Sequence, residues 1–391
     1  MKRKILLMVL CLSLTSCSKV DKLVEEHIIL NDKQVEVYSD TYLYDLLTVK
    51  DVTLITENSL VDTLEVGKKS VTIKYQLDKH EYTYDLVYEV VDTTIPRTFG
   101  GLNKTVTVGS DILPCNLITY GDNYDNEVSC EVIGEYNLNE VGSYKISYLL
   151  KDDSNNTNEF NGILNVIEKS NKTNNSSSNN TKKDLFTEIV AKYKTKNTEI
   201  GIDVSKWQGQ IDFQKVKEDG ATFVMIRLGY QTSSTRELVI DPYFYDNLTN
   251  AKAAGLKVGI YFYSIAINEK EAVSQANWVL DILDNEFLDL PICFDWESWS
   301  KWNSFKMSFY DINNVANKFL DTINLSGYEG MLYSSKYYLE NIWENKLNYP
   351  VWLAHYTKKT SYTGDYVMWQ LSNTGKIAGI NGDVDINVLY K

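Results

Sequence analysis

The chain has 391 residues, of which 43% are hydrophobic, so it is long enough for two or three domains with ordinary cores. Its formal net charge of -14 argues against a nucleic-acid-binding protein, because proteins that bind phosphate backbones show a basic footprint. The three histidines, His27, His80 and His355, are scattered, and no Cys/His grouping has the spacing of metal ligands. We therefore predict neither a metal site nor a cofactor.

Five cysteines are too few for a disulfide scaffold, so their positions matter more than their number. Cys11 and Cys17 fall in the N-terminal leader, and Cys293 lies in an apolar strand, where it is expected to pack inside the fold. Only Cys115 and Cys130 are placed so that they could pair. The sequence leaves open whether they do.

Residues 1–17 have the layout of a cleaved secretory signal. Three basic residues precede an apolar run over residues 5–14, which is too short to span a bilayer. The run ends in residues 14–17 (LTSC), which resemble a bacterial lipobox. This resemblance implies a lipid on Cys17 and a location at the outer face of the cell membrane, facing the cell wall. The alternative is an ordinary signal peptide with an incidental cysteine.

Residues 21–168 alternate short strands rich in Val, Ile, Tyr and Thr with Asp/Asn/Gly turns, which indicates β-sandwich modules. A repeat supports two modules, at 21–92 and 93–168, because residues 65–67 (EVG) followed by 71–75 (VTIKY) recur as 140–142 (EVG) followed by 144–148 (YKISY), with an offset of 75 residues between the two EVG segments. The second copy carries residues 92–96 (DTTIP), 122–125 (DNYD) and 151–156 (KDDSNN), which resemble landmarks of bacterial surface Ig-like repeats. Such repeats are spacers, although a ligand-binding module is the alternative.

Residues 169–183 contain no apolar side chain and cannot contribute to a core, so they are predicted to be a polar linker. The linker region extends to residue 198 and includes a short lead-in helix over residues 185–194.

From residue 199 to 391, apolar strands alternate with helical segments, which is typical of a sheet built from βα units. Strands are predicted at 200–204, 223–228, 257–263, 291–295, 330–333, 351–354, 367–371 and 383–386. Asp241 is predicted to cap a helix that begins at Pro242 and stops at Gly255. The pattern gives eight strands but only about five helices.

The fourth of these strands, residues 291–297 (PICFDWE), ends in two carboxylates. Side chains two apart on a strand share a face, so Asp295 and Glu297 should lie roughly 6 to 7 Å apart. Like charges at that distance raise at least one pKa, as a proton donor near neutral pH requires. A bare D-x-E pair is nevertheless most often a solvated strand end, so its context has to decide.

That context is a series of motifs in family order: 201–209 (GIDVSKWQG), 227–230 (RLGY), 259–263 (GIYFY), 294–297 (FDWE), 352–356 (WLAHY), 369–370 (WQ) and 384–387 (VDIN). The domain resembles glycoside hydrolase family 25, the muramidases of the bacterial and phage lysozyme type. The resemblance implies an irregular, TIM-like β/α barrel whose cleft lies at the C-terminal strand ends. It also implies hydrolysis of the β-1,4 bond between N-acetylmuramic acid and N-acetylglucosamine in peptidoglycan, by a monomer that needs no cofactor.

Glycoside cleavage needs a protonated acid at the leaving oxygen and negative charge near an oxocarbenium-like centre. We therefore assign Glu297 as the general acid and Asp295 as the group that stabilises that centre or orients the substrate's acetamido group. Asp203 and Asp385 would tune pKa values, position water or hold sugar hydroxyls, because the first and last strands of a closed barrel are neighbours.

Aromatic rings can stack on the apolar faces of sugars. The positions that match the family are Tyr261, Tyr333, Trp352 and Tyr356, with Arg227 and Gln370 as polar partners. At least one of Trp296, Trp299 and Trp302 is also expected to line the cleft.

Parts of the sequence also fit two other functions. A chitinase-like barrel also places D-x-E at a strand end, but its longer motif requires Asp where this chain has Leu290 and Cys293. A non-catalytic carbohydrate-binding or adhesive surface lipoprotein remains the alternative to an enzyme.

Overall fold

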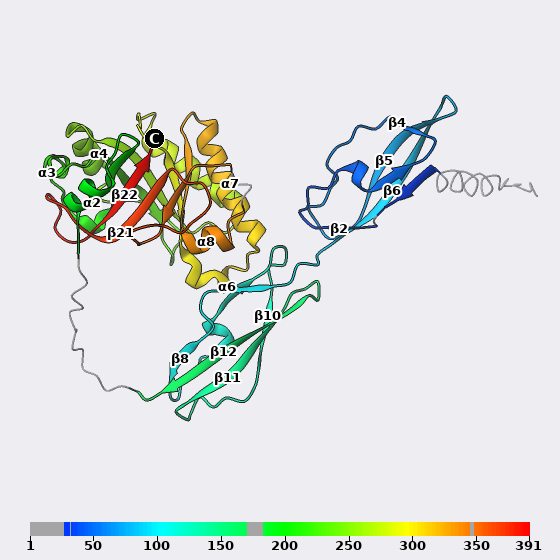
Figure 1. The fold of residues 1–391 in the computed structure, drawn as a ribbon, viewed down its shortest axis with the longest axis horizontal. Helices are drawn as coiled ribbons and strands as arrows, with labels where there is room; N and C mark the ends of the chain where they lie inside the picture. Colours follow the sequence, from blue (N-terminus) through cyan, green and yellow to red (C-terminus); the bar gives the residue numbers. More distant parts are fainter. Residues whose placement is uncertain (1–26, 32, 170–182, 345–347) are drawn as a thin grey trace, which may run out of the picture. The chain divides into compact units, whose positions relative to one another are not determined.

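The structure is a computed structural model that describes residues 27–31, 33–169, 183–344 and 348–391 (Figure 1). The predicted leader, the lipidation site Cys17 and residues 170–182 of the predicted linker lie outside these described residues. The chain divides into two compact units, residues 1–94 and residues 95–391. Within the described ranges, no helix is both long enough and apolar enough to cross a membrane.

The first unit is all-β in its described part. A four-stranded sheet has the order β2-β6-β5-β4, and β1 pairs with β3 in a separate ladder. The bounds are β1 (Ile28–Leu30), β2 (Gln34–Glu36), β3 (Leu47–Val49), β4 (Thr53–Leu54), β5 (Gly67–Leu77) and β6 (His80–Val91). The long β5–β6 hairpin turns at Asp78 and Lys79, which both have positive φ, and this twist suits a two-residue hairpin loop.

The second unit begins with another β module. Its four-stranded sheet has the order β10-β11-β12-β8, and β7 pairs with β9. The bounds are β7 (Arg97–Phe99), β8 (Lys104–Thr107), β9 (Thr119–Gly121), β10 (Ser129–Ile133), β11 (Gly142–Lys151) and β12 (Thr157–Ile167). The repeat seen in the sequence corresponds to two hairpins, since β5 begins at Gly67 and β11 at Gly142.

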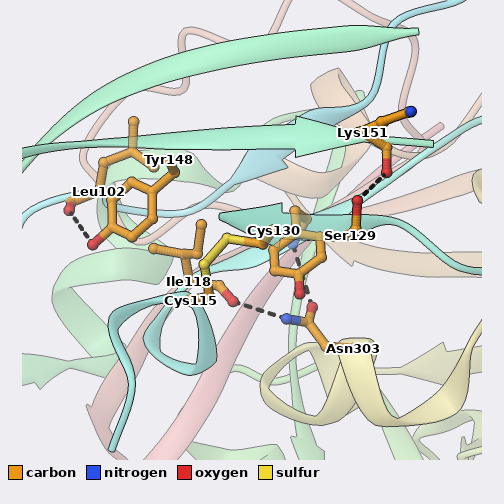
Figure 2. The surroundings of a disulfide bond; sticks show 9 residues. Leu102, Cys115, Ile118, Ser129, Cys130, Tyr148, Lys151 and Asn303 are labelled. Carbon is orange, nitrogen blue, oxygen red and sulfur yellow. Dashed lines mark hydrogen bonds between the residues drawn. A yellow bond between two sulfur atoms is a disulfide. The ribbon is translucent and has the colours of Figure 1, made fainter. Parts of the chain in front are cut away.

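A disulfide joins the two cysteines whose pairing the sequence left open. Cys115, in the short 3-10 helix Pro114–Leu117, bonds to Cys130 on β10, with the Cα atoms 6.0 Å apart (Figure 2). The bond closes a loop over a sequence separation of 15 residues beside the module's small core, in which Tyr148 is fully buried. It therefore reinforces a module whose hydrophobic core is limited.

The rest of the unit is a closed barrel. Its strands run in the order β21-β20-β19-β18-β17-β15-β14-β22, and a β21–β22 pairing closes the ring. The bounds are β14 (Thr198–Val204), β15 (Phe223–Gln231), β17 (Lys257–Ser264), β18 (Ile292–Trp296), β19 (Gly330–Ser335), β20 (Val351–Ala354), β21 (Met368–Lys376) and β22 (Val384–Tyr390). Two short strands, β13 (Asp184–Leu185) and β16 (Leu238–Ile240), attach to β21 and β15. All eight predicted barrel strands are thus present.

One strand direction differs from the all-parallel barrel expected from the sequence. Neighbouring strands are parallel from β14 through β21, but β22 is antiparallel to both β14 and β21. The sequence pattern of a short apolar strand does not encode its direction, so this could not be read in advance.

Helices surround the barrel, and the labels α3, α4, α7 and α8 mark several of them in Figure 1. Their bounds are α2 (Phe186–Tyr193), α3 (Phe213–Glu218), α4 (Phe244–Ala253), α5 (Glu269–Leu283), α6 (Trp302–Phe305), α7 (Phe309–Leu325) and α8 (Lys336–Asn341). The lead-in helix is confirmed as α2. The predicted start of α4 at Pro242 is wrong, because the helix begins only at Phe244. Asp241 still caps this turn, since its Oδ1 atom accepts from the Tyr243 amide at 3.0 Å while its Oδ2 atom binds Arg227 and the Lys206 amide.

Alternation along the strands separates two cores. One group of buried side chains meets inside the barrel, and Cys293 packs there as expected. Its other members are Phe223, Met225, Met331, Tyr333, Trp352, Ala354 and Met368. The opposite faces of the same strands, including Val224 and Ile226, pack in a larger cluster with the helices. The interior is therefore a packed core, and polar chemistry is left to the strand ends.

The second β module packs against the barrel through the segment that follows β18. The Phe99 ring lies edge-to-face on Trp302 and Phe309, with ring centroids 5.4 and 5.8 Å apart. Gly121 approaches so closely that an added Cβ would stand 2.9 Å from Trp302 Nε1. Any larger residue at this position would push the two surfaces apart.

Hydrogen bonds fix the same contact. Asn303 Nδ2 donates to the Ile118 carbonyl at 3.0 Å, and Asn303 Oδ1 accepts from the Tyr120 amide at 3.3 Å (Figure 2). The Gly100 amide donates to the Tyr337 hydroxyl at 2.6 Å. The segment after the D-x-E motif is thus held by the β module as well as by the barrel.

Candidate active site

Four carboxyl groups come together at one end of the barrel. Asp203 lies near the end of β14, and Asp385 faces it across the antiparallel β14–β22 ladder. Asp295 lies near the end of β18, and Glu297 follows directly after that strand. Asp385 reaches this end because β22 runs in the opposite direction and presents its beginning there, rather than its end as an all-parallel barrel would require.

Asp203 is the most firmly held of the four. Its Oδ2 atom accepts hydrogen bonds from Gln370 Nε2 at 2.9 Å and Asn387 Nδ2 at 2.8 Å. Burial raises the pKa of Asp203 to about 6, although these donors and Asp385 oppose the shift by favouring the ionised form.

Asp385 binds a proton more tightly than its partner. Burial raises its pKa to about 8, and the negative charges of Asp203 and Glu297 add to that shift. Gln370 Nε2 also lies 3.3 Å from Asp385 Oδ2. At neutral pH the pair Asp203 and Asp385 therefore shares a proton, which resides mainly on Asp385.

Asp295 is the more buried of the two acids in the D-x-E pair. It is 5% exposed, and its Oδ1 atom has no hydrogen-bond partner among the described residues. Burial raises its pKa well above the usual range, and the charges of Glu297 and Asp203 act in the same direction, whereas Arg227 opposes them. No group in the described part of the chain therefore compensates this buried oxygen.

Glu297 lies at the rim. Its backbone has left the extended conformation, with φ -128° and ψ 10°, so it does not continue the strand as the sequence suggested. The side chain remains exposed, yet neighbouring protein atoms partly desolvate the carboxyl and raise its pKa, with a further contribution from Asp203. Between the two acids, Trp296 is fully buried and its Nε1 donates to the Ala266 carbonyl. Asp295 and Glu297 are close enough to repel each other, as predicted.

Gln370 connects the carboxylates to two tyrosines. Its Oε1 atom accepts from the Tyr333 hydroxyl at 2.9 Å and from the Tyr356 hydroxyl at 3.0 Å, while its Nε2 atom donates to Asp203. These bonds fix the orientation of the Gln370 amide. Tyr356 is 52% exposed and can offer a ring face to a sugar, whereas Tyr333 is 7% exposed.

The other residues predicted to bind substrate mainly contact other side chains of the protein. Trp352 is 2% exposed, and its Nε1 donates to Asn387 Oδ1 at 2.8 Å. Tyr261 is half-buried and lies edge-to-face against Trp352. Arg227 is bound by Asp241 through an ion pair of 2.6 Å, so its charge acts on Asp295 from a fixed position.

The expectation that one of the three tryptophans after β18 lines the cleft is wrong. Trp296, Trp299 and Trp302 are 0%, 6% and 2% exposed. Trp299 stacks on Trp302, and Trp296 lies edge-to-face against both. Phe99 of the β module, about 200 residues earlier in the chain, lies edge-to-face on Trp299 and Trp302. The reason is a tertiary contact that no local pattern reveals.

Two residues at the site had no predicted role. Asn387 bridges Trp352 and Asp203, and its position two residues after Asp385 on the same strand was the available signal. Trp207 is 77% exposed in the loop after β14 and carries Lys206 Nζ 5.1 Å above its ring. This exposed indole beside the barrel mouth can stack on a sugar ring. Trp207 belongs to the motif at residues 201–209, which was the available signal.

Comparison with known proteins gives a consistent result. The family model for glycosyl hydrolases family 25 matches residues 202–380. The uncharacterized protein YegX of Escherichia coli O157:H7 is 31% identical over 195 residues, which cover 48% of this chain and 68% of that protein. The autolytic lysozyme of Clostridium acetobutylicum is 30% identical over 48% of this chain and 54% of its own length. Lysozyme M1 of Streptomyces globisporus is 28% identical over 48% of this chain and 66% of its own.

Proposed function

The chain belongs to glycosyl hydrolases family 25, and on this premise we propose that it cleaves the β-1,4 bond between N-acetylmuramic acid and N-acetylglucosamine in peptidoglycan. It is a glycoside hydrolase, as are the two lysozymes it resembles, and it acts outside the cytoplasm on the cell wall. The observation that carries the proposal is the group of four carboxyls at one barrel mouth. Their raised pKa values favour a proton donor near neutral pH, and the carboxyl groups that ionise during the reaction supply negative charge.

Glu297 is the general acid in this proposal. Its carboxyl is at the exposed rim, where a glycosidic oxygen can reach it, and its raised pKa keeps more of it protonated near neutral pH. Proton transfer to the leaving oxygen would leave Glu297 ionised.

Asp295 supports the positive centre or orients the substrate's acetamido group. It lies behind Glu297 with one oxygen unpartnered, and the fixed charge of Arg227 favours its ionised form. Contact with a developing positive charge would oppose the raised pKa of Asp295 and favour its ionised form, so its negative charge would be strongest in the transition state.

Asp203 and Asp385 hold the polar end of the site. Gln370 and Asn387 donate to Asp203, while the proton that Asp385 retains prevents a third full charge from forming beside Glu297. Exposed Tyr356 supplies a stacking surface next to this group, and half-buried Tyr261 is the other candidate among the predicted rings.

The segments before the barrel serve to place it. Lipid on Cys17 would anchor the chain to the outer face of the membrane, and the two all-β modules would act as Ig-like spacers. The polar linker then leads to a monomeric enzyme that remodels nearby wall rather than lysing cells freely. Cys17→Ala, which removes the residue that would carry the lipid, should therefore release the protein from the membrane and reduce wall turnover at the cell surface.

The direct test is Glu297→Gln in the full chain, assayed by release of reducing ends from purified peptidoglycan. Loss of a general acid should lower the rate about 10²-fold or more. The matched control is Glu329→Gln, an exposed glutamate next to the beginning of β19, which should keep the wild-type rate. A folded Glu297→Gln protein with wild-type activity would remove the acid assignment, and wild-type protein that binds the wall without cleaving it would favour a carbohydrate-binding role.

A further inference from the structure

A second group of carboxylates lies in the second β module, away from the catalytic mouth. Asp122 and Asp125 belong to the turn after β9, and Asp152 belongs to the turn between β11 and β12. One oxygen from each of the three lies within 4.8 Å of the others. The chain therefore brings together two of the acidic landmarks that the sequence contained and that the enzyme's chemistry does not use.

These carboxylates are buried without a matching positive partner. Asp122, Asp152 and Asp125 are 1%, 3% and 9% exposed. Asp122 Oδ2 and Asp152 Oδ2 have no hydrogen-bond partner in the part of the chain that the structure describes, and neither has the buried Oδ1 atom of Asn123 in the same turn. Ionised groups in this state are costly to bury, so the arrangement requires a compensating charge.

The protein's own cations do not supply it. Among the described residues, no lysine or arginine forms an ion pair with any of the three carboxylates. Arg97 interacts electrostatically with Asp122, but its guanidinium lies over the Phe309 ring. Burial, together with repulsion between the aspartates, raises the pKa of Asp122 to about 6 and also raises that of Asp152.

The other oxygens of the group are held in place by backbone amides. Asp122 Oδ1 accepts from two amides of its own turn, at 2.9 and 3.1 Å. Asp152 Oδ1 accepts from the Asn156 amide at 2.7 Å, and Asp125 Oδ2 accepts from the Ser154 amide at 3.0 Å. The backbone thus orients each side chain before any ligand arrives, which is the property of a built site rather than of a mobile acidic patch.

We propose that Asp122, Asp125 and Asp152 form a binding site for a calcium ion. All three donors are hard carboxylate oxygens, and Asn123 offers an uncharged oxygen in the same turn. Calcium accepts six to eight oxygens in flexible geometry, whereas magnesium keeps several of its waters, for which buried side chains leave little room. The absence of nitrogen or sulfur donors from this group argues against zinc.

Bound calcium would also stabilise the surface that the barrel contacts. The Asp122 carbonyl accepts from the Phe309 amide at 2.8 Å, and the Asn123 carbonyl accepts from the Tyr310 amide at 3.2 Å. These amides are in the first turn of α7, so the turn that would bind the ion also satisfies the beginning of a barrel helix. The site would thereby couple the order of the module to the position of the segment that follows Glu297.

The test uses the full chain after treatment with a chelator. Calcium, added up to about 10 mM to cover the affinities of about 10⁻⁴ to 10⁻³ M common in extracellular modules, should raise the thermal unfolding midpoint, and magnesium should have a smaller effect. Asp122→Asn combined with Asp152→Asn should weaken calcium binding at least tenfold. Asp153→Asn, which changes the exposed neighbouring aspartate, is the matched control and should bind calcium as the wild type does.

Several outcomes would overturn the proposal. These are a wild-type midpoint that calcium does not move, an equal response to magnesium, or an unchanged calcium response in the double variant. Without calcium the double variant should unfold at or above the wild-type midpoint, because it lacks the repulsion between carboxylates. Should it fail to fold, terbium luminescence of the wild type decides, because emission that calcium cannot displace would rule the site out.

Discussion

We expect Asp385→Asn to make the protein more stable than the wild type at neutral pH. The asparagine amide can replace the proton that Asp385 shares with Asp203, but it cannot ionise. In the folded chain the pKa of Asp385 is about 8, against an ordinary value of 3.8. The stability that the wild-type carboxyl contributes is therefore complete below about pH 4, and it is lost as the pH rises toward 8. The variant has no such loss, so its advantage should grow over the same interval.

The pKa shift sets the size of the effect. About three pH units lie between the ordinary value of 3.8 and pH 7, and each is worth about 1.4 kcal/mol, which gives a ceiling of about 4 kcal/mol. Asp385 is only partly buried and its titration is shared with Asp203, so we expect about 2 kcal/mol at pH 7. Near pH 4 the two proteins should be equally stable.

The assay is urea unfolding of both proteins at pH 4.5, 7 and 9, followed by tryptophan fluorescence. Asp281→Asn, an exposed change in the last turn of α5, is the control and should differ little from the wild type at any pH. An Asp385→Asn advantage that does not change with pH, or a variant less stable than the wild type at pH 9, would refute the account of the shared proton.

Three further results are expected. Asp203→Asn removes a negative charge that raises the pKa of Glu297, so the alkaline limb of the pH–rate profile should move to lower pH; an unmoved limb would mean that the two groups do not interact. Asn303→Ala leaves two backbone groups of the β module without partners and should cost about 1–3 kcal/mol of unfolding free energy in urea, whereas an unchanged midpoint would show that the contact contributes little. Replacing Cys115 and Cys130 with alanine opens a 15-residue loop and should destabilise the module by about 3 kcal/mol in calorimetry. A variant as stable as the disulfide-bonded wild type would contradict this expectation.

The sequence predicted the framework of the site well because its signals are local. Apolar strands between helices gave all eight barrel strands, and motif order brought Asp203, Asp295, Glu297 and Asp385 to one mouth. Each carboxylate lies at or near a strand end, and the closure of the barrel converts those four separate positions into one group.

What the sequence could not supply depends on partners distant in the chain. The direction of β22 follows from the short connection over residues 377–383, which suits antiparallel neighbours, rather than from the residues of the strand itself. Trp299 and Trp302 are buried because Phe99 packs on them, and the Asp241 carboxylate binds Arg227 in addition to the Tyr243 amide beside α4. Likewise, Asp122 and Asp152 stand 30 residues apart and follow strands of different sheets, and only the fold of the β module brings their oxygens together.

The central claim is that the barrel cuts peptidoglycan on the reducing side of N-acetylmuramic acid. Digestion of purified peptidoglycan, followed by borohydride reduction and mass analysis, identifies the sugar at each new reducing end. The account predicts reduced N-acetylmuramic acid in the wild-type digest and its loss with Glu297→Gln. Reduced N-acetylglucosamine, or no new reducing ends at all, would contradict it.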